Sequence, residues 1–90
     1  MKKIFRRDKL RIYGDLLRVL YNESKTEKIV LSQVQIRINV PFDRLKQYIL
    51  DLRDLGLIDD KTLNLTDKGK EYLMEYERIL EFMKRMGLTY

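Results

Sequence analysis

The segment from Leu31 to Thr66 constrains the fold most, because two residues divide it sharply. Pro41 stands where a helix can begin, since proline is favoured in the first helical turn. Gly56 stands where that helix can stop. The residues between them place one apolar stripe at helical spacing: Leu45, Tyr48, Ile49, Leu52 and Leu55. The pattern therefore predicts an amphipathic helix over residues 42–55.

The residues after Gly56 alternate between short apolar runs and turn formers. Residues 57–59 and 63–65 read as two short strands joined through residues 60–62. Thr66 is a suitable cap for a last helix from residue 67 to about residue 86, roughly 30 Å long at about 1.5 Å per residue. We therefore expect a mainly α fold with a small β-hairpin and a long C-terminal helix.

Residues 8–31 predict a first helix, a loop and a short extended run. Asp8 is a plausible cap for a helix that runs to about Asn22, with apolar residues at helical spacing. Gly14 inside this helix costs about 1 kcal/mol relative to alanine, which indicates close packing there. Residues 22–27 are polar and read as a loop, and residues 28–31 form a β-like run.

Residues 33–38 are open to two interpretations. Ser32 can cap a helix over them, but residues 33–40 alternate polar and apolar side chains, which is a strand pattern. We favour the helix because of the turn and the helix that follow it.

The composition limits the functions available to the chain. Ninety residues form one domain, and such a chain buries only roughly 60% of its unfolded surface. Without Cys or His, disulfides are excluded and neither a structural metal nor a cofactor is expected, so oligomerisation is the remaining common way to stabilise it. The same absence removes the ordinary acid–base and thiolate groups of enzymes near neutral pH. We therefore expect no enzymatic activity.

The chain shows no membrane or export signal. Its longest apolar run is too short to span a bilayer, and no apolar core follows the basic start as it would in a signal peptide. The lack of cysteine suits a reducing compartment. We expect a soluble, cytoplasmic, nucleoid-associated protein with no membrane partner.

Positive charge is concentrated at the N-terminus. Residues 1–11 alone account for the net charge of +5 of the whole chain. Six cations stand there against Asp8: Lys2, Lys3, Arg6, Arg7, Lys9 and Arg11. Such a segment suggests a polyanionic partner, most often nucleic acid. The alternative is a solvated tail that only aids solubility.

Several short runs resemble the winged helix-turn-helix superfamily over about residues 8–75. They are Leu31-Ser32, Val40-Pro41, Leu45, Leu55-Gly56-Leu57-Ile58 and Leu65-Thr66-Asp67-Lys68-Gly69. Within that superfamily the chain is most similar to small archaeal DNA-binding proteins whose last helix pairs with its mate as an antiparallel coiled coil. The resemblance implies a basic arm over residues 1–7, a winged helix over 8–66 and a dimerisation helix over 67–90. Gln35 departs from the alanine usual at its position, and the wing is short.

The resemblance implies that helix 42–55 enters the major groove of DNA. Its N-terminal part then supplies the base and phosphate contacts, the wing adds one cation and the arm follows the backbone. The candidate DNA-binding residues are Lys2, Lys3, Arg6, Arg7, Phe42, Asp43, Arg44, Lys46, Gln47 and Lys61. Arg44 is suited to guanine and Gln47 to adenine, while Lys46 is suited to phosphate. The alternative is that these are ordinary solvated charges, because the helix is electrically neutral overall.

The last helix carries more apolar surface than its own domain needs. Its apolar side chains cover an arc of roughly 140°, against about 100° for an ordinary surface helix, and follow a coiled-coil spacing. We expect Tyr72, Leu73 and Tyr76 to seal part of the monomer core. The expected dimer interface is Tyr72, Tyr76, Ile79, Leu80, Phe82, Met83 and Met86. The alternative is a helix folded back along its own domain.

These observations lead to one preferred function and two alternatives. The preferred function is a homodimeric regulator that binds double-stranded DNA at two half-sites. The first alternative is an architectural protein that coats DNA with little sequence preference. The second is a winged helix that binds another protein and no DNA, since a fold alone does not give function.

Overall fold

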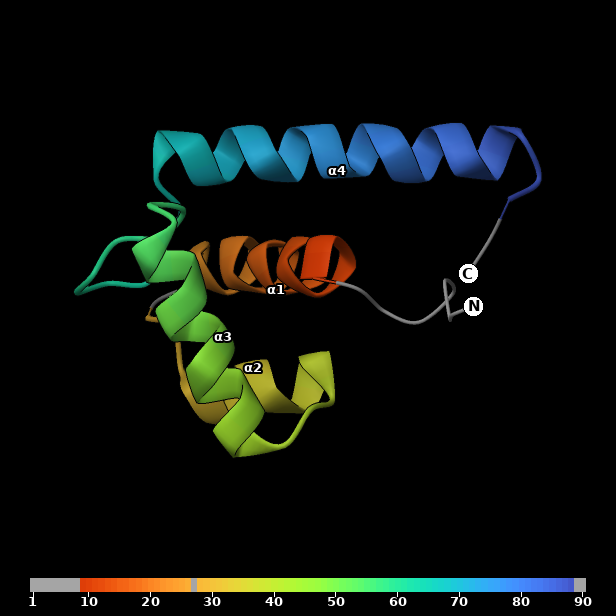
Figure 1. Cartoon of the computed structure of the whole chain (residues 1–90). Helices are drawn as coiled ribbons and strands as arrows, with labels where there is room; N and C mark the ends of the chain where they lie inside the picture. The colour runs from red at the N-terminus through yellow and green to blue at the C-terminus, as the bar shows by residue number, and fades with distance from the viewer. Residues whose placement is uncertain (1–8, 27, 89–90) are drawn as a thin grey trace.

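The computed structural model describes residues 9–26 and 28–88. Its helices are α1 (Lys9–Ser24), α2 (Leu31–Ile38), α3 (Phe42–Asp54) and α4 (Asp67–Arg85). In Figure 1, α1 lies between α4 on one side and the α2–α3 pair on the other, and α1 packs directly against both α2 and α4. The first helix is therefore the central element of the molecule.

The core gathers around the apolar face of α1. The largest fully buried side chains are Leu16, Leu17, Leu20, Val34, Leu45 and Leu52. Each of these is worth roughly 1.5–3 kcal/mol in apolar burial. Leu45, Ile49 and Leu52 are all buried, as the apolar stripe of the predicted helix 42–55 required.

The helix expected over residues 33–38 is confirmed, but its cap is not Ser32. The helix begins at Leu31, and the N–H groups of Gln33 and Val34 both donate to the carbonyl of Val30, at 3.0 and 3.1 Å. Val30 is therefore the N-cap residue, and Ser32 lies inside the first turn. The prediction failed because the chain starts the helix with a backbone carbonyl rather than with a side-chain cap.

The turn between α2 and α3 depends on the backbone conformation of Asn39 and on the side chain of Gln35. Asn39 ends α2 in the left-handed region, with φ 60°, which asparagine tolerates better than most residues. The Gln35 side chain donates to the carbonyl of Val40 at 3.2 Å. Gln35, which departs from the usual alanine, thus supports the turn. Pro41 is the N-cap residue of α3, in extended conformation, and so lies just before the first helical turn in which proline was expected.

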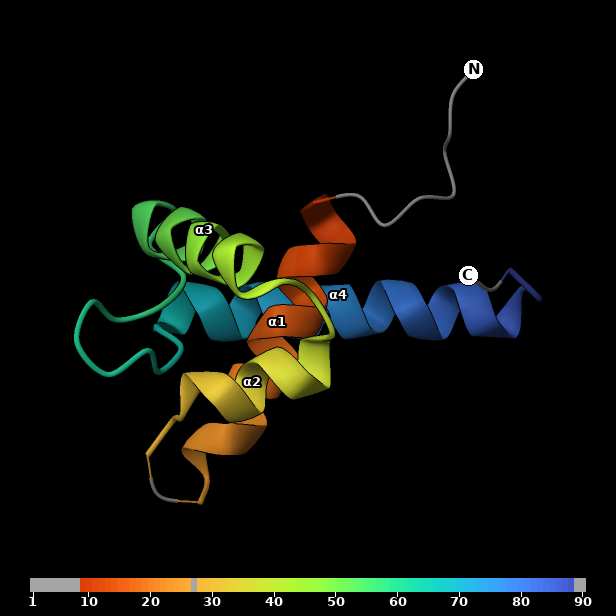
Figure 2. The ribbon, with the colours of Figure 1, turned by 90° about the horizontal axis from the view of Figure 1, so that it is seen from below.

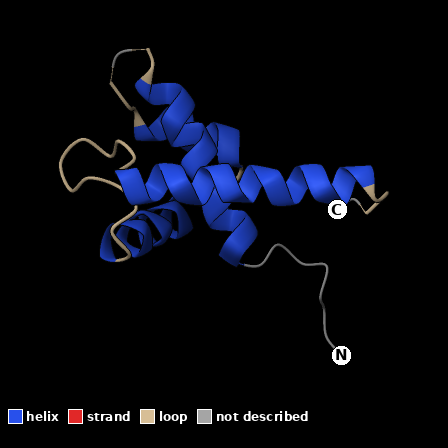
Figure 3. Cartoon of the chain, turned by 90° about the horizontal axis from the view of Figure 1, so that it is seen from above, coloured by secondary structure: helices blue, strands red, loops and turns tan. Residues whose placement is uncertain are grey.

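The expected β-hairpin is reduced to one bridge. Among the described residues no strand is formed, and Figure 3 shows loop between α3 and α4. Ile58 and Leu65 make a single antiparallel bridge. The chain reverses too tightly for more pairs, because the Leu63 N–H turns back to the Asp59 carbonyl at 3.2 Å and Leu63 takes φ 65°.

Three other expectations concern an extended run and two capping residues. Residues 28–30 form no strand, since the described part offers them no ladder partner. Thr66 caps α4 as expected, and its Oγ1 accepts from the Gly69 N–H at 3.1 Å. Asp8, the expected cap of α1, lies outside the described residues.

α1 and α4 cross at Gly14. A Cβ atom placed there would overlap the ring of Tyr76, which is itself 2% exposed. The close packing that Gly14 indicated is therefore present, and its partner is the aromatic ring of the long helix.

We predict that Gly14→Ala destabilises the protein although alanine is the better helix former. The methyl group has to displace a buried ring, and overpacking of this kind costs roughly 1–3 kcal/mol against about 1 kcal/mol of gained helix propensity. Urea denaturation measures the difference. Asn22→Ala, at an exposed position of the same helix, is the matched control and should not lower the midpoint. Equal midpoints for Gly14→Ala and the wild type would contradict the packing described here.

Candidate nucleic-acid interface

The first two turns of α3 expose every residue that the sequence nominated there. These residues, the α3 contact cluster, are Phe42, Asp43, Arg44, Lys46 and Gln47. Figure 2 shows α3 at the edge of the molecule. The cluster is therefore accessible to a large partner.

The two cations of the cluster differ in their contacts with neighbouring side chains. The Lys46 ammonium lies 5.5 Å from the centroid of the Phe42 ring, a cation–π contact worth about 0.5–1 kcal/mol at an exposed site. Arg44 has no ion pair with any residue in the described part of the chain. The guanidinium of Arg44 is thus available for a bidentate contact, while Phe42 steadies the ammonium of Lys46.

A carboxylate behind the cluster fixes α3 to α1. Asp51 accepts hydrogen bonds from the Tyr13 hydroxyl at 2.7 Å and from the Gln47 side chain at 3.1 Å. These two bonds, the Tyr13 bond first, hold the pKa of Asp51 below its usual 3.8. The Tyr13 ring also meets the Tyr48 ring edge-on, with centroids 6.3 Å apart. Gln47 is thereby oriented, and its exposed side-chain oxygen accepts no hydrogen bond from any described residue.

Tyr13 is the buried end of this chain of hydrogen bonds. Burial, and then the hydrogen bond to Asp51, raise the pKa of Tyr13 from 10.0 to about 12. The hydroxyl therefore stays a donor at neutral pH.

The wing, residues 57–65, is tied to the end of α3. Arg53 and Asp60 form an ion pair at 3.3 Å that is not aligned as a hydrogen bond. Asp59 Oδ2 accepts from the backbone N–H groups of Lys61 and Thr62, both at 2.9 Å. These backbone bonds lower the pKa of Asp59, so its carboxylate stays charged and holds the turn. Lys61 is exposed at the tip, as expected.

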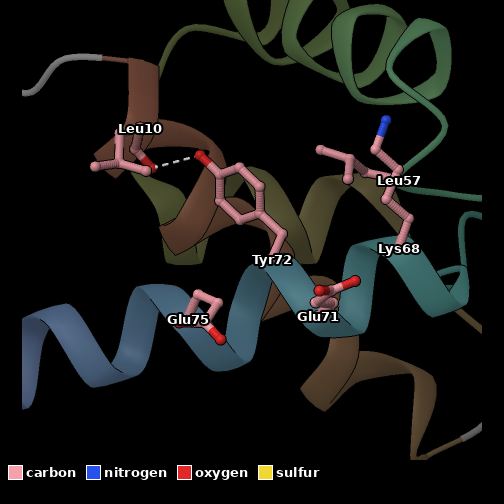
Figure 4. Close-up of a pocket in the computed structure, with 6 residues that line it drawn as sticks. All are labelled: Leu10, Leu57, Lys68, Glu71, Tyr72 and Glu75. Atoms are coloured by element: carbon pink, nitrogen blue, oxygen red, sulfur yellow. Dashed lines mark hydrogen bonds between the residues drawn. The ribbon is translucent and has the colours of Figure 1, made fainter.

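An apolar groove of about 310 Å³ opens beside the first half of α4 (Figure 4). Its lining residues are Leu10, Leu57, Lys68, Glu71, Tyr72 and Glu75. The Tyr72 hydroxyl donates to the Leu10 carbonyl at 3.0 Å, and the Lys68 ammonium donates to the Leu55 carbonyl at 2.7 Å. These bonds close the groove against α1 and the end of α3.

The residues expected at a dimer interface divide into three sets by their burial. Tyr76 belongs to the monomer core, where its hydroxyl donates to Asp15 at 2.8 Å and where burial, then this bond, raise its pKa. Ile79, Phe82 and Met86 are 40%, 50% and 54% exposed. Tyr72, Leu80 and Met83 are partly buried. In Figure 1 the second half of α4 extends beyond α1, so none of the other described helices covers this part of it.

Comparison with known families gives a match over most of the chain. A family model described as winged helix-turn-helix matches residues 6–84. The chain belongs to this family. Winged helix-turn-helix domains are typically DNA-binding and non-enzymatic. Comparisons with curated proteins and with solved structures found no match.

Residues 9–26 and 28–88 contain neither a metal-binding cluster nor a membrane-spanning helix. No group of acidic, His or Cys side chains there is suited to hold a metal ion. None of the helices in the same ranges is long and apolar enough to cross a membrane.

The winged helix holds contacts that sequence reasoning did not find. The Tyr13–Asp51 bond and the Arg53–Asp60 pair join residues that no local pattern relates. Asn39 did carry a signal, since asparagine before a Val-Pro turn suits a left-handed helix end. The arm residues Lys2, Lys3, Arg6 and Arg7 lie outside the described residues.

We predict that Tyr13→Phe lowers the free energy of unfolding by about 1–2 kcal/mol at pH 7, the worth of a hydrogen bond to a charged group. Because the folded pKa of Asp51 is depressed, the contribution is present above about pH 4 and lost as the pH falls further. Because the folded pKa of Tyr13 is raised, the contribution is also present below pH 10 and lost as the pH rises towards 12.

Urea denaturation between pH 2 and pH 12 tests this difference. Tyr48→Phe is the control, because the Tyr48 hydroxyl has no hydrogen bond to any described residue. If Tyr13→Phe lowers the free energy of unfolding by the same amount at every pH, the loss does not come from the hydrogen bond between the Tyr13 hydroxyl and Asp51.

Proposed function

We propose that this winged helix protein is a homodimeric double-stranded DNA-binding protein that acts as a transcriptional regulator. The observation that supports this most is the α3 contact cluster, exposed on a helix that the Tyr13–Asp51 hydrogen bond joins to α1. A rigid helix with free polar side chains at its start is the usual means of reading the major groove.

Each member of the cluster has a separate role in this proposal. Arg44 binds guanine through its free guanidinium, and Gln47 binds adenine through the amide atoms that Asp51 leaves available. Lys46 neutralises a phosphate beside Phe42. Asp43 repels phosphates and so penalises wrong placement. The arm cations Lys2, Lys3, Arg6 and Arg7 add backbone contacts that do not depend on sequence.

The uncovered second half of α4 supports the dimer. Ile79, Phe82 and Met86 form an exposed apolar stripe that leads away from the groove at Tyr72. Exposed apolar surface of this kind marks an interaction site. Pairing two copies along the stripe buries it and presents two α3 helices to two half-sites, so that two weak contacts give one useful affinity.

We predict that Arg44→Ala and Lys46→Ala weaken DNA binding in different ways. Losing Arg44 costs about 1–3 kcal/mol on the preferred sequence and relaxes specificity at one position, whereas losing Lys46 weakens all duplexes alike and lowers the salt slope by about 1. Salt titrations with one random duplex and one duplex from the protein's own promoter region measure both effects. Lys70→Ala, an exposed cation on α4, is the control.

The same titration separates the alternatives. A preference of a hundredfold or more, about 2.8 kcal/mol, supports a regulator. Equal, salt-steep binding to both duplexes supports an architectural protein instead. Absence of binding to either duplex at low salt rejects the DNA proposal and leaves a protein-interaction module.

We predict that Phe82→Glu makes the protein monomeric while α4 stays helical. A carboxylate on the stripe would be buried without a partner in the dimer, which is strongly unfavourable. Analytical ultracentrifugation and circular dichroism measure the two properties. Met74→Glu is the matched control, because Met74 is 53% exposed on the same helix but away from the stripe. A Phe82→Glu variant that keeps the mass of the wild-type assembly argues against this interface.

A further inference from the structure

The apolar groove beside the first half of α4 has the size and the lining of a small-molecule site. Its volume of about 310 Å³ falls at the lower end of the roughly 300–1,000 Å³ typical of such sites. Leu57 is 2% exposed and Leu10 is 44% exposed, so one gives the groove a buried apolar surface and the other an accessible one. In Figure 4 the ring of Tyr72 lies between these two leucines. The groove therefore offers a ligand two aliphatic side chains and one aromatic ring.

Contacts between three parts of the chain fix the shape of the groove. Gly69, in the first turn of α4, packs directly on the backbone of Leu57, because a Cβ atom there would overlap the Leu57 carbonyl oxygen. The Tyr72 hydroxyl donates to the Leu10 carbonyl at 3.0 Å, which joins α4 to the start of α1. A ligand then meets a site that is already formed, and a site of this kind loses little conformational entropy on binding.

Two carboxylates border the groove on the α4 side. Glu71 and Glu75 stand four residues apart on this helix, and both are exposed. Glu71 forms no ion pair with any residue in the described part of the chain. Glu75 lies 3.4 Å from Arg78, but both side chains are more than half exposed, and such a surface pair contributes little. This edge of the groove can therefore attract a cation.

The cation of the lining does not reverse this preference. The Lys68 ammonium already donates to the Leu55 carbonyl at 2.7 Å. Against it stand Glu71 and Glu75, so the lining residues carry one more carboxylate than ammonium. An aromatic ring beside carboxylates is the combination that recognises organic ammonium ions, since the ring face and the carboxylates both attract positive charge.

We propose that this groove binds a small organic amine, with its apolar body on Leu10, Leu57 and Tyr72 and its ammonium group at Glu71 and Glu75. The site is separate from the α3 contact cluster and from the exposed stripe of α4, which begins only at Ile79. The inference does not depend on DNA binding. It adds a ligand site where α1, α4 and the loop after α3 meet.

The test is an NMR titration of the backbone amides of the full chain with three probes at neutral pH. Phenylbutylamine, phenylbutanol and phenylbutyrate share one apolar body and differ in the charge of the head group. We expect saturable shifts at the amides of Leu10, Leu57 and Tyr72. The amine should bind about threefold to tenfold more tightly than the alcohol, as two exposed carboxylates allow, and the butyrate should bind most weakly.

Variants locate the two halves of the ligand. The double variant Glu71→Gln with Glu75→Gln should remove the preference for the amine and leave the affinity for the alcohol unchanged. Glu81→Gln makes the same kind of charge change at an exposed position of α4 outside the groove, and it should keep the preference. Leu10→Gln removes an apolar wall and should weaken all three probes alike.

Three results would overturn the proposal. Equal affinities for the three probes would show that the carboxylates do not select the charge of the ligand. Tightest binding of the butyrate would assign the groove to an anion at Lys68. Shifts that do not saturate, or an equal loss of amine preference in Glu81→Gln, would show only general attraction of cations to the acidic side chains of α4.

Discussion

The approach of α1 to α4 at Gly14 is the contact on which the rest of the molecule depends. Only a residue without a side chain lets the Tyr76 ring lie against the α1 backbone. The neighbouring residue, Tyr13, holds Asp51 of α3 from α1. Two consecutive residues of one helix thus fix both the long helix and the helix proposed to read DNA. A change in either contact should therefore alter the spacing between the two surfaces.

Local signals predicted the parts of the fold that depend on local chemistry. Pro41 and Gly56 bounded α3, and Thr66 capped α4, because a fixed φ, a missing side chain or a hydroxyl acts within a few residues. The β-hairpin was wrong because its pairing depends on how Leu63 turns, which strand propensity does not encode. The Tyr13–Asp51 bond and the Arg53–Asp60 pair depend on the packed fold, so no sequence pattern could have located them.

In the proposed complex, the charge distribution assigns base recognition to α3 and electrostatic attraction to cations elsewhere in the chain. The cations of α3 are balanced by Asp43, Asp51 and Asp54, so this helix draws little affinity from the DNA field. Asp51 also has a structural role, since its carboxylate accepts hydrogen bonds from Tyr13 and Gln47. In the proposed complex, electrostatic attraction to DNA then depends on cations outside α3, such as those of the arm. Selectivity depends on side chains such as Arg44, whose hydrogen bonds to the correct base are lost when a different base stands at that position.

The exposed apolar side chains in the second half of α4 bear on the stability of the fold. A chain of this size has a marginal core of its own, and the exposed stripe of Ile79, Phe82 and Met86 adds apolar surface that the monomer leaves in water. The proposed pairing would remove that surface from water and so favour the folded state by mass action. The apparent stability of the winged helix should then rise with protein concentration. Dimerisation would in this way serve both the folding of α4 and the presentation of two α3 helices.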